Sequence, residues 1–277
     1  MMRGVATAAL VLALAGCDLQ DAPSPQPPVA TAPAPAAPAA EQTSPGPCGS
    51  RTEAPGGVTT TAHTYDGGRR VRTVRSSPAG QTQTLWSYDA QGRRRKEVTI
   101  DGASVSATTF HYEGGLLLRT EVDDDGAGHV VERRLRTYDD GKLVERTVER
   151  LRGDGFAVEE THALHYDQRG RFVYELESKT PADGPTTVRS ITVDVDDDGR
   201  VQARRIDEGM TGTFERISLF SYDSGGRLST LTRMDGEAVA EVSRHGYDAA
   251  GRLVRTSIED GNGAVHTTTT YDFSCWE

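Results

Sequence analysis

The clearest candidate for metal chemistry is an acidic run in which carboxylates alternate along the chain. Asp194-Val195-Asp196-Asp197-Asp198-Gly199 places oxygens at positions one, three and five, as in the first half of a calcium loop. Position twelve is Arg205, where a complete loop needs a bidentate glutamate. The same aspartates and glycine also suit an ordinary turn. We therefore expect no required cofactor, with weak calcium binding by Asp194, Asp196 and Asp198 as the alternative.

Residues suited to catalysis do not form a known motif. The chain has no Gly-x-Ser-x-Gly, no His-Glu-x-x-His and no phosphate-binding glycine loop. His162 and His165 are the closest pair of histidines, but a spacing of three on a strand points them to opposite faces. We predict that the protein is not an enzyme. An envelope hydrolase is the alternative, and no motif favours it.

The first residues have the features of an export signal. Arg3 precedes an apolar run, residues 5–15, that is too short to span a bilayer as a stable helix. The run ends in Leu14-Ala15-Gly16-Cys17, which closely resembles the bacterial lipobox. The resemblance implies a signal peptide over residues 1–16 and acyl chains, such as palmitate, on Cys17 that anchor the chain to a membrane. Asp18 leaves open the choice between inner and outer membrane.

Residues 17–47 read as the lipidated cysteine followed by a tether. The segment is rich in proline and alanine, a composition that cannot bury a core and favours an extended, solvated chain. At about 3.1 Å per residue it would hold a domain up to roughly 90 Å from the lipid.

Residues 48–277 form a repeat domain. The chain contains nine tyrosines, and all but Tyr174 open a Tyr-Asp-x-x-Gly-Arg unit or a variant of it. These tyrosines are Tyr65, Tyr88, Tyr112, Tyr138, Tyr166, Tyr222, Tyr247 and Tyr271. A β-branched or polar run flanks each unit on both sides, and the Asp and Gly favour a tight turn between two strands. The pattern predicts an all-β fold, an antiparallel meander of about sixteen strands.

The iterated unit closely resembles the YD repeat of the RHS family, over nearly all of residues 58–272. In large members of that family the repeats form a hollow β-shell around a toxin domain, and some members are linked to carbohydrate binding. This chain has about eight repeats, and we expect neither a C-terminal effector domain nor a self-cleavage segment. The resemblance therefore implies the sheet, as a curved sheet or a closed, barrel-like shell.

The two faces of the predicted sheet differ. Positions two residues before each tyrosine share its face, and they include aromatic and aliphatic side chains, whereas the intervening positions are mostly polar. The aromatic residues on this face could stack on sugars, although packing within the sheet is their commoner role. The candidates for binding are Trp86, Tyr88, Phe110, Tyr112, Phe220 and Tyr222.

Two cysteines remain after Cys17, at the two ends of the repeat domain. Cys48 precedes the first predicted strand and Cys275 follows the last tyrosine. An even pair beyond the membrane, where the environment is oxidising, favours a disulfide, with two free or intermolecular thiols as the alternative. A bond would require the ends of the sheet to lie within about 7 Å at Cα, as in a sheet rolled until its edges meet.

Charge narrows the class of partner. Acidic residues outnumber Lys and Arg by 41 to 31, which disfavours nucleic acid. We expect a cell-envelope lipoprotein that presents a non-catalytic β-scaffold to a glycan or protein partner. An accessory role in a polymorphic-toxin system is a variant that rests on the family resemblance alone.

Overall fold

The computed structural model describes residues 46–276, which form 18 strands and a short terminal 3-10 helix. The strands are β1 (Gly49–Ala54), β2 (Gly57–Asp66), β3 (Arg69–Ser77), β4 (Gly80–Tyr88), β5 (Arg94–Asp101), β6 (Ser104–Glu113), β7 (Leu116–Asp123), β8 (Val130–Asp139), β9 (Lys142–Arg152), β10 (Gly155–Tyr166), β11 (Phe172–Lys179), β12 (Thr187–Val195), β13 (Val201–Glu208), β14 (Arg216–Tyr222), β15 (Leu228–Asp235), β16 (Ala238–Tyr247), β17 (Leu253–Asp260) and β18 (Val265–Asp272); the helix η1 is Ser274–Trp276. Among these residues, no helix has the length and apolar character needed to cross a membrane. The predicted signal peptide, Cys17 and all but the last two residues of the predicted tether lie outside the described residues.

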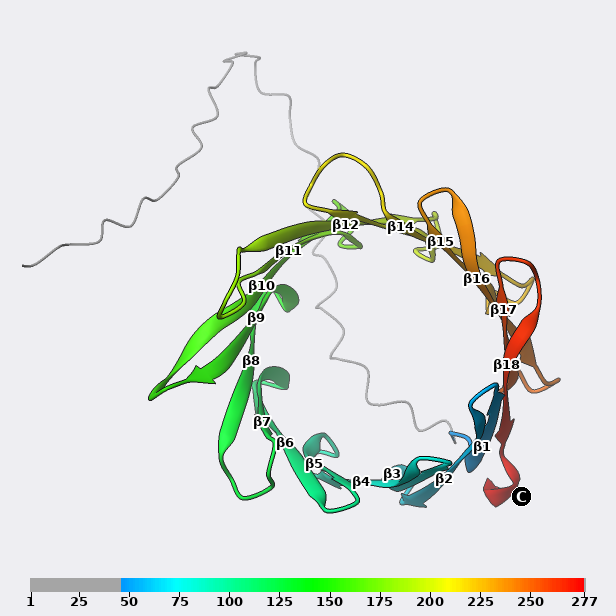
Figure 1. Ribbon diagram of the computed structural model, residues 1–277, viewed down its shortest axis with the longest axis horizontal. Helices are drawn as coiled ribbons and strands as arrows, with labels where there is room; N and C mark the ends of the chain where they lie inside the picture. The colour runs from blue at the N-terminus through cyan, green and yellow to red at the C-terminus, as the bar shows by residue number, and fades with distance from the viewer. Residues whose placement is uncertain (1–45, 277) are drawn as a thin grey trace, which may run out of the picture. The chain divides into compact units, whose positions relative to one another are not determined.

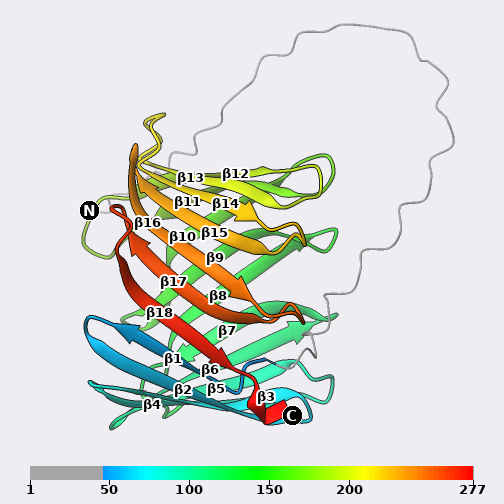
Figure 2. The ribbon, with the colours of Figure 1, turned by 90° about the vertical axis from the view of Figure 1, so that its right-hand side faces the viewer.

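The sheet closes on itself. Each strand pairs antiparallel with the next, as β9 does with β10, and β1 pairs with both β2 and β18. Figure 1 shows the resulting ring of strands, and Figure 2 shows β14 to β18 side by side, with β1 and β2 beyond them. The predicted all-β meander is therefore confirmed and the sheet is a closed barrel, with 18 strands where about sixteen were expected.

The alternation of strand direction gives the barrel two different rims. Hairpins that carry the tyrosine units all lie at one end, where the even-numbered strands finish, and we call this end the tyrosine rim. The β1–β2 turn and the remaining hairpins, such as the one between β11 and β12, lie at the other end, which we call the opposite rim. The start of β1 and the end of β18 both lie at the tyrosine rim because Gly49 pairs with Asp272.

The two turn lengths in the sequence correspond to two turn geometries. In the short form, both central residues have positive φ, as Gly67 and Gly68 do at 54° and 80°. This geometry matches the right-handed twist of the strands that it joins. In the long form, the Gly92 N–H donates to the Asp89 carbonyl oxygen at 3.0 Å, and Gly92 itself has a φ of 80°. The glycine is therefore required at the bulge that follows the turn.

Side chains at the tyrosine rim connect each repeat to the next. In the long turns Arg Nε donates to the aspartate carboxylate of the same unit at 2.6–2.8 Å, which forms an ion pair at the corner of the hairpin. The guanidinium of Arg227 then lies 4.7 Å from the ring centre of Tyr247 in the next unit. Tyr247 donates its hydroxyl hydrogen to the Leu228 carbonyl oxygen at 2.8 Å. Equivalent tyrosine-to-carbonyl bonds span 2.6–3.0 Å around the rim.

The face that carries the tyrosines is the inner face of the barrel. Along β2 the residues on this face, from Thr59 to Tyr65, are half-buried, while the intervening residues are exposed. Side chains on the concave side of a closed sheet converge and cover one another, whereas those on the convex side diverge. The fully apolar core is small: Ile191, Val193 and Ile206 form its one buried cluster within residues 46–276, and all three lie on the inner face.

Candidate functional site

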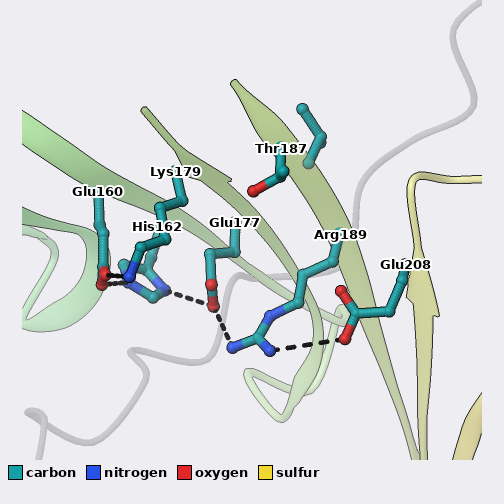
Figure 3. A pocket seen from close by; sticks show the side chains of 8 residues that line it. Glu160, His162, Glu177, Lys179, Thr187, Arg189 and Glu208 are labelled. Carbon is teal, nitrogen blue, oxygen red and sulfur yellow. Dashed lines mark hydrogen bonds and ion pairs between the residues drawn. The ribbon is translucent and has the colours of Figure 1, made fainter. Parts of the chain in front are cut away.

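A polar cavity of about 320 Å³ lies against the inner face near the opposite rim. It is built by four adjacent strands, β10 to β13, whose registers place the charged side chains in one row. Figure 3 shows these side chains directed toward one another along the row. The lining residues are Glu160, His162, Glu177, Lys179, Thr187, Val188, Arg189 and Glu208.

His162 is the centre of this row. Its Nδ1 atom hydrogen-bonds to Glu175 Oε1 at 2.7 Å and lies 3.5 Å from Glu177 Oε2, while Nε2 lies 3.7 Å from Glu160 Oε2. Only 13% of the His162 side chain is exposed, so the imidazole is held between three carboxylates and away from bulk water.

Of the three carboxylates around His162, the two most buried, Glu175 and Glu177, each also bind an arginine. Arg146 Nη2 donates to Glu175 at 2.6 Å, and Arg189 Nη2 donates to Glu177 at the same distance. The hydrogen bond from His162 and the nearby Arg146 charge hold the pKa of Glu175 below its usual range. Glu175 is therefore ionised at neutral pH, and a general acid would instead need a raised pKa.

His162, Glu175 and Glu177 are also the one group of mixed metal-ligand type in the described part of the chain. One ligand atom from each lies within 4.8 Å of the other two. A cation there would compete with Arg146 and Arg189 for the same carboxylate oxygens. The arrangement is that of a neutralised ion-pair network, which stabilises the inner face and fixes the row of side chains.

The six aromatic candidates all lie on the inner face, where they are half-buried. Trp86 Nε1 donates to Glu97 Oε2 at 2.8 Å, and the Arg70 guanidinium lies 5.4 Å from the Trp86 ring centre. Tyr88 donates to the Arg70 carbonyl oxygen at 2.6 Å. The structure brings them into a row around the barrel, and their role in ligand binding stays a prediction. The six are Trp86, Tyr88, Phe110, Tyr112, Phe220 and Tyr222.

The predicted calcium loop does not gather its carboxylates. Asp194 lies on the outer face of β12 and pairs with Arg205, whereas Asp196 lies in the turn at the tyrosine rim. Asp196 accepts Arg200 Nε at 2.8 Å, and Asp198 accepts Arg200 Nη2 at 2.7 Å. A cation would have to displace these arginines, and calcium binding stays a prediction.

A second acidic group lies in the turn between β7 and β8. Asp123 accepts backbone N–H groups from Asp125, Gly126 and Gly128 at 2.6–3.1 Å. A hydrogen bond from His129 lowers the pKa of Asp125 to about 2. These carboxylates act as turn formers with their oxygens already occupied.

The disulfide between Cys48 and Cys275 is confirmed. The two Cα atoms lie 5.6 Å apart across 227 residues of sequence. The Cys48 N–H donates to the Asp272 carbonyl oxygen at 2.6 Å, so the disulfide lies next to the β1–β18 pairing. It joins the two ends of the sheet at the tyrosine rim.

Sequence reasoning missed Glu175 and Glu177, the residues that organise the polar row. A signal was present, because Glu175, Glu177 and Lys179 alternate on one face of a predicted strand. Their partner His162 becomes visible only when the hairpin is folded and His162 is set opposite Glu177. The prediction that His162 and His165 point to opposite faces is confirmed by the same register.

Comparisons with known proteins find weak similarity to solved structures. No family model matches it, and no curated protein matches it. Solved structures that resemble it include TcdB2-TccC3, at 12% identity and a TM-score of 0.39, over 77% of this chain and 14% of that one. A porin-like protein from Bacteroides uniformis matches at 14% identity and a TM-score of 0.43, over 81% of this chain and 96% of that one. A porin-like protein from Bacteroides vulgatus matches at 9% identity and a TM-score of 0.37, over 73% and 97%. Likenesses at this level support no conclusion about activity.

Proposed function

We propose that this chain is a YD-repeat lipoprotein of the bacterial cell envelope, whose barrel binds a glycan or protein partner and catalyses no reaction. The observation that carries the proposal is the inner face, a closed and disulfide-bonded wall lined with aromatic and charged side chains. Such a wall suits recognition because it holds many polar contacts in fixed positions. The lipobox at Cys17 supports attachment to the inner or outer membrane through lipid.

The charged side chains of the outer face favour a barrel that is surrounded by water rather than by lipid. In the middle of the strands it carries Glu121, which lies 3.3 Å from Arg119 and 3.5 Å from Arg133. Arg244 and Glu259 form another outer pair at 2.8 Å. An arginine on a lipid-facing strand costs about 2–4 kcal/mol at mid-depth. We therefore propose a tether, with Cys17 as the only contact with the membrane.

The polar row around His162 favours binding over catalysis. Hydrogen bonds from His162 and Lys179 lower the pKa values of Glu175 and Glu160, so both are ionised at neutral pH. The lining of the cavity offers no cysteine or serine as a nucleophile. An envelope hydrolase would need a carboxylate or histidine that is free to exchange a proton with a substrate.

Two experiments test the proposal separately. Full-length wild type and Cys17→Ser are expressed in a bacterial host with labelled palmitate, and the membrane and soluble fractions are compared. We expect label and membrane association in the wild type only. Equal membrane association of the two proteins would contradict the lipid anchor.

Binding is tested with the mature chain on an array of bacterial envelope glycans and against cross-linked envelope extracts. Trp86→Ala, on the inner face, is compared with Tyr174→Ala, whose side chain lies on the outer face opposite His165. We expect Trp86→Ala to reduce a specific signal and Tyr174→Ala to leave it unchanged. A signal that falls only with Tyr174→Ala would place recognition on the outer face and refute the proposal.

A further inference from the structure

Two arginines face each other inside the barrel without a carboxylate between them. Arg136 on β8 and Arg146 on β9 are direct cross-strand partners on the inner face. Like charges in directly opposite positions destabilise a sheet. Arg146 binds Glu175 through Nη2, but Arg136 forms no ion pair with any residue of the range 46–276.

Three buried polar atoms at this place lack hydrogen-bond partners among the described residues. They are Arg136 Nη1, Arg146 Nε and Thr120 Oγ1. Thr120 is 3% exposed and lies on β7 opposite Arg134, so it is diagonal to Arg136 on the same face. Residues in diagonal positions lie about 7–8 Å apart, within reach of an arginine side chain. Three neighbouring strands therefore direct unused donors to one region of the inner wall.

The neighbours of Arg136 do not compensate its charge. Arg134 is bound to Glu132 at 2.7 Å, and Tyr112 and Tyr138 are the other titratable groups close to the guanidinium. Burial lowers the pKa of Arg136, and the charges of Arg146 and Arg134 act in the same direction. Buried unpaired donors of this kind are rare in native proteins and mark a place for a missing partner.

We propose that Thr120, Arg136 and Arg146 form a binding site for an oxyanion: a phosphate, a sulfate or the carboxylate of a sugar acid. The two guanidinium groups supply charge and parallel N–H donors, which suit oxyanions in particular. The threonine hydroxyl supplies a third donor. The bound anion removes the repulsion between the arginines and satisfies the buried atoms. This site is separate from the row around His162, although Arg146 touches both, and it does not depend on the proposed lipid anchor.

The test is thermal unfolding of the mature chain with sodium phosphate or sodium sulfate, against sodium chloride at equal ionic strength. A ligand at ten times its dissociation constant should raise the melting temperature by about 3–6 °C. Arg136→Gln should abolish this rise. The matched control is Arg204→Gln, because Arg204 lies on the inner face and its direct cross-strand partners are Val193 and Ser218 rather than a second arginine. We expect Arg204→Gln to respond as the wild type does.

Thr120→Val keeps the shape of the side chain and removes the hydroxyl, so it tests the site without removing a charge. We expect phosphate affinity, measured by calorimetry, to fall about tenfold. Sodium glucuronate and sodium acetate separate the sources: tighter binding of glucuronate indicates a sugar acid, and equal binding indicates a free anion. A rise in Arg136→Gln equal to that of the wild type, or an equal rise with chloride, would overturn the site and leave ordered water or ionic screening as the explanation.

Discussion

Breaking the Cys48–Cys275 bond should destabilise the barrel by an amount set by the loop that it closes. The two cysteines are 227 residues apart, and the chain-entropy relation gives about 5 kcal/mol for a loop of that length. Part of this is lost because denatured chains keep residual structure. We expect about 3–5 kcal/mol, which corresponds to a fall of about 6–20 °C in melting temperature for a domain of this size.

The assay compares the wild type with and without a reductant that is stable on heating, together with the double variant Cys48→Ser, Cys275→Ser. The double variant should have the same melting temperature as the reduced wild type, and the reductant should not change it. In hydrogen exchange, amides of β1 and β18 should lose protection on reduction before those of β9 and β10, on the far side of the ring. A melting temperature that reduction leaves unchanged would refute the reasoning, because the β1–β18 pairing alone would then hold the ends together.

Three further outcomes follow from the contacts. Tyr247→Phe removes the hydrogen bond to the Leu228 carbonyl and should cost about 0.5–1.5 kcal/mol in chemical denaturation; no change would mean that water replaces the hydroxyl. Glu175 has a lowered pKa in the folded state, so its stabilising effect is complete above its ordinary pKa of 4.5 and is lost as pH falls through the folded value. Glu175→Gln should therefore flatten the fall in melting temperature below pH 4.5, and an unchanged slope would contradict this. The arginines already bound in the predicted calcium loop lead us to expect no heat at millimolar calcium in calorimetry, and saturable heat would show that the loop binds the ion.

The repeat pattern was sufficient to predict the strands and turns because each unit specifies its own hairpin. Aspartate, glycine and arginine fix the turn locally, and the length of the unit separates the two turn geometries. The strand that the repeat pattern did not predict is β1, before the first repeat unit. β1 has no tyrosine unit, and its sequence, Gly49–Ala54, is polar and short. It is a strand because β2 and β18 each offer it an edge, which is information that local sequence does not contain.

From the sequence, closure of the barrel was predictable only as one of two alternatives, the other being an open, curved sheet. The paired cysteines favoured it, and the structure places them 5.6 Å apart. The polar row near His162 was not predictable, because its contacts cross four strands and depend on each register in turn. A shift of one residue in β11 would move Glu175 and Glu177 to the outer face. The arginine pair on β8 and β9 depends on register in the same way.

The structure separates what the repeats share from what distinguishes them. Tyrosine, aspartate and arginine at the tyrosine rim bind one another from unit to unit, so changes there disturb the closure of the ring. The inner position two residues before each tyrosine is not part of these contacts, and there the units differ: Trp86, Phe110, Arg136, Leu164 and Phe220 occupy equivalent places. A scaffold that keeps its rim constant and varies its inner wall can change what it binds without changing how it folds. Three of the aromatic candidates, Trp86, Phe110 and Phe220, lie in this variable row together with Arg136, and variants that alter binding and spare stability should be sought there.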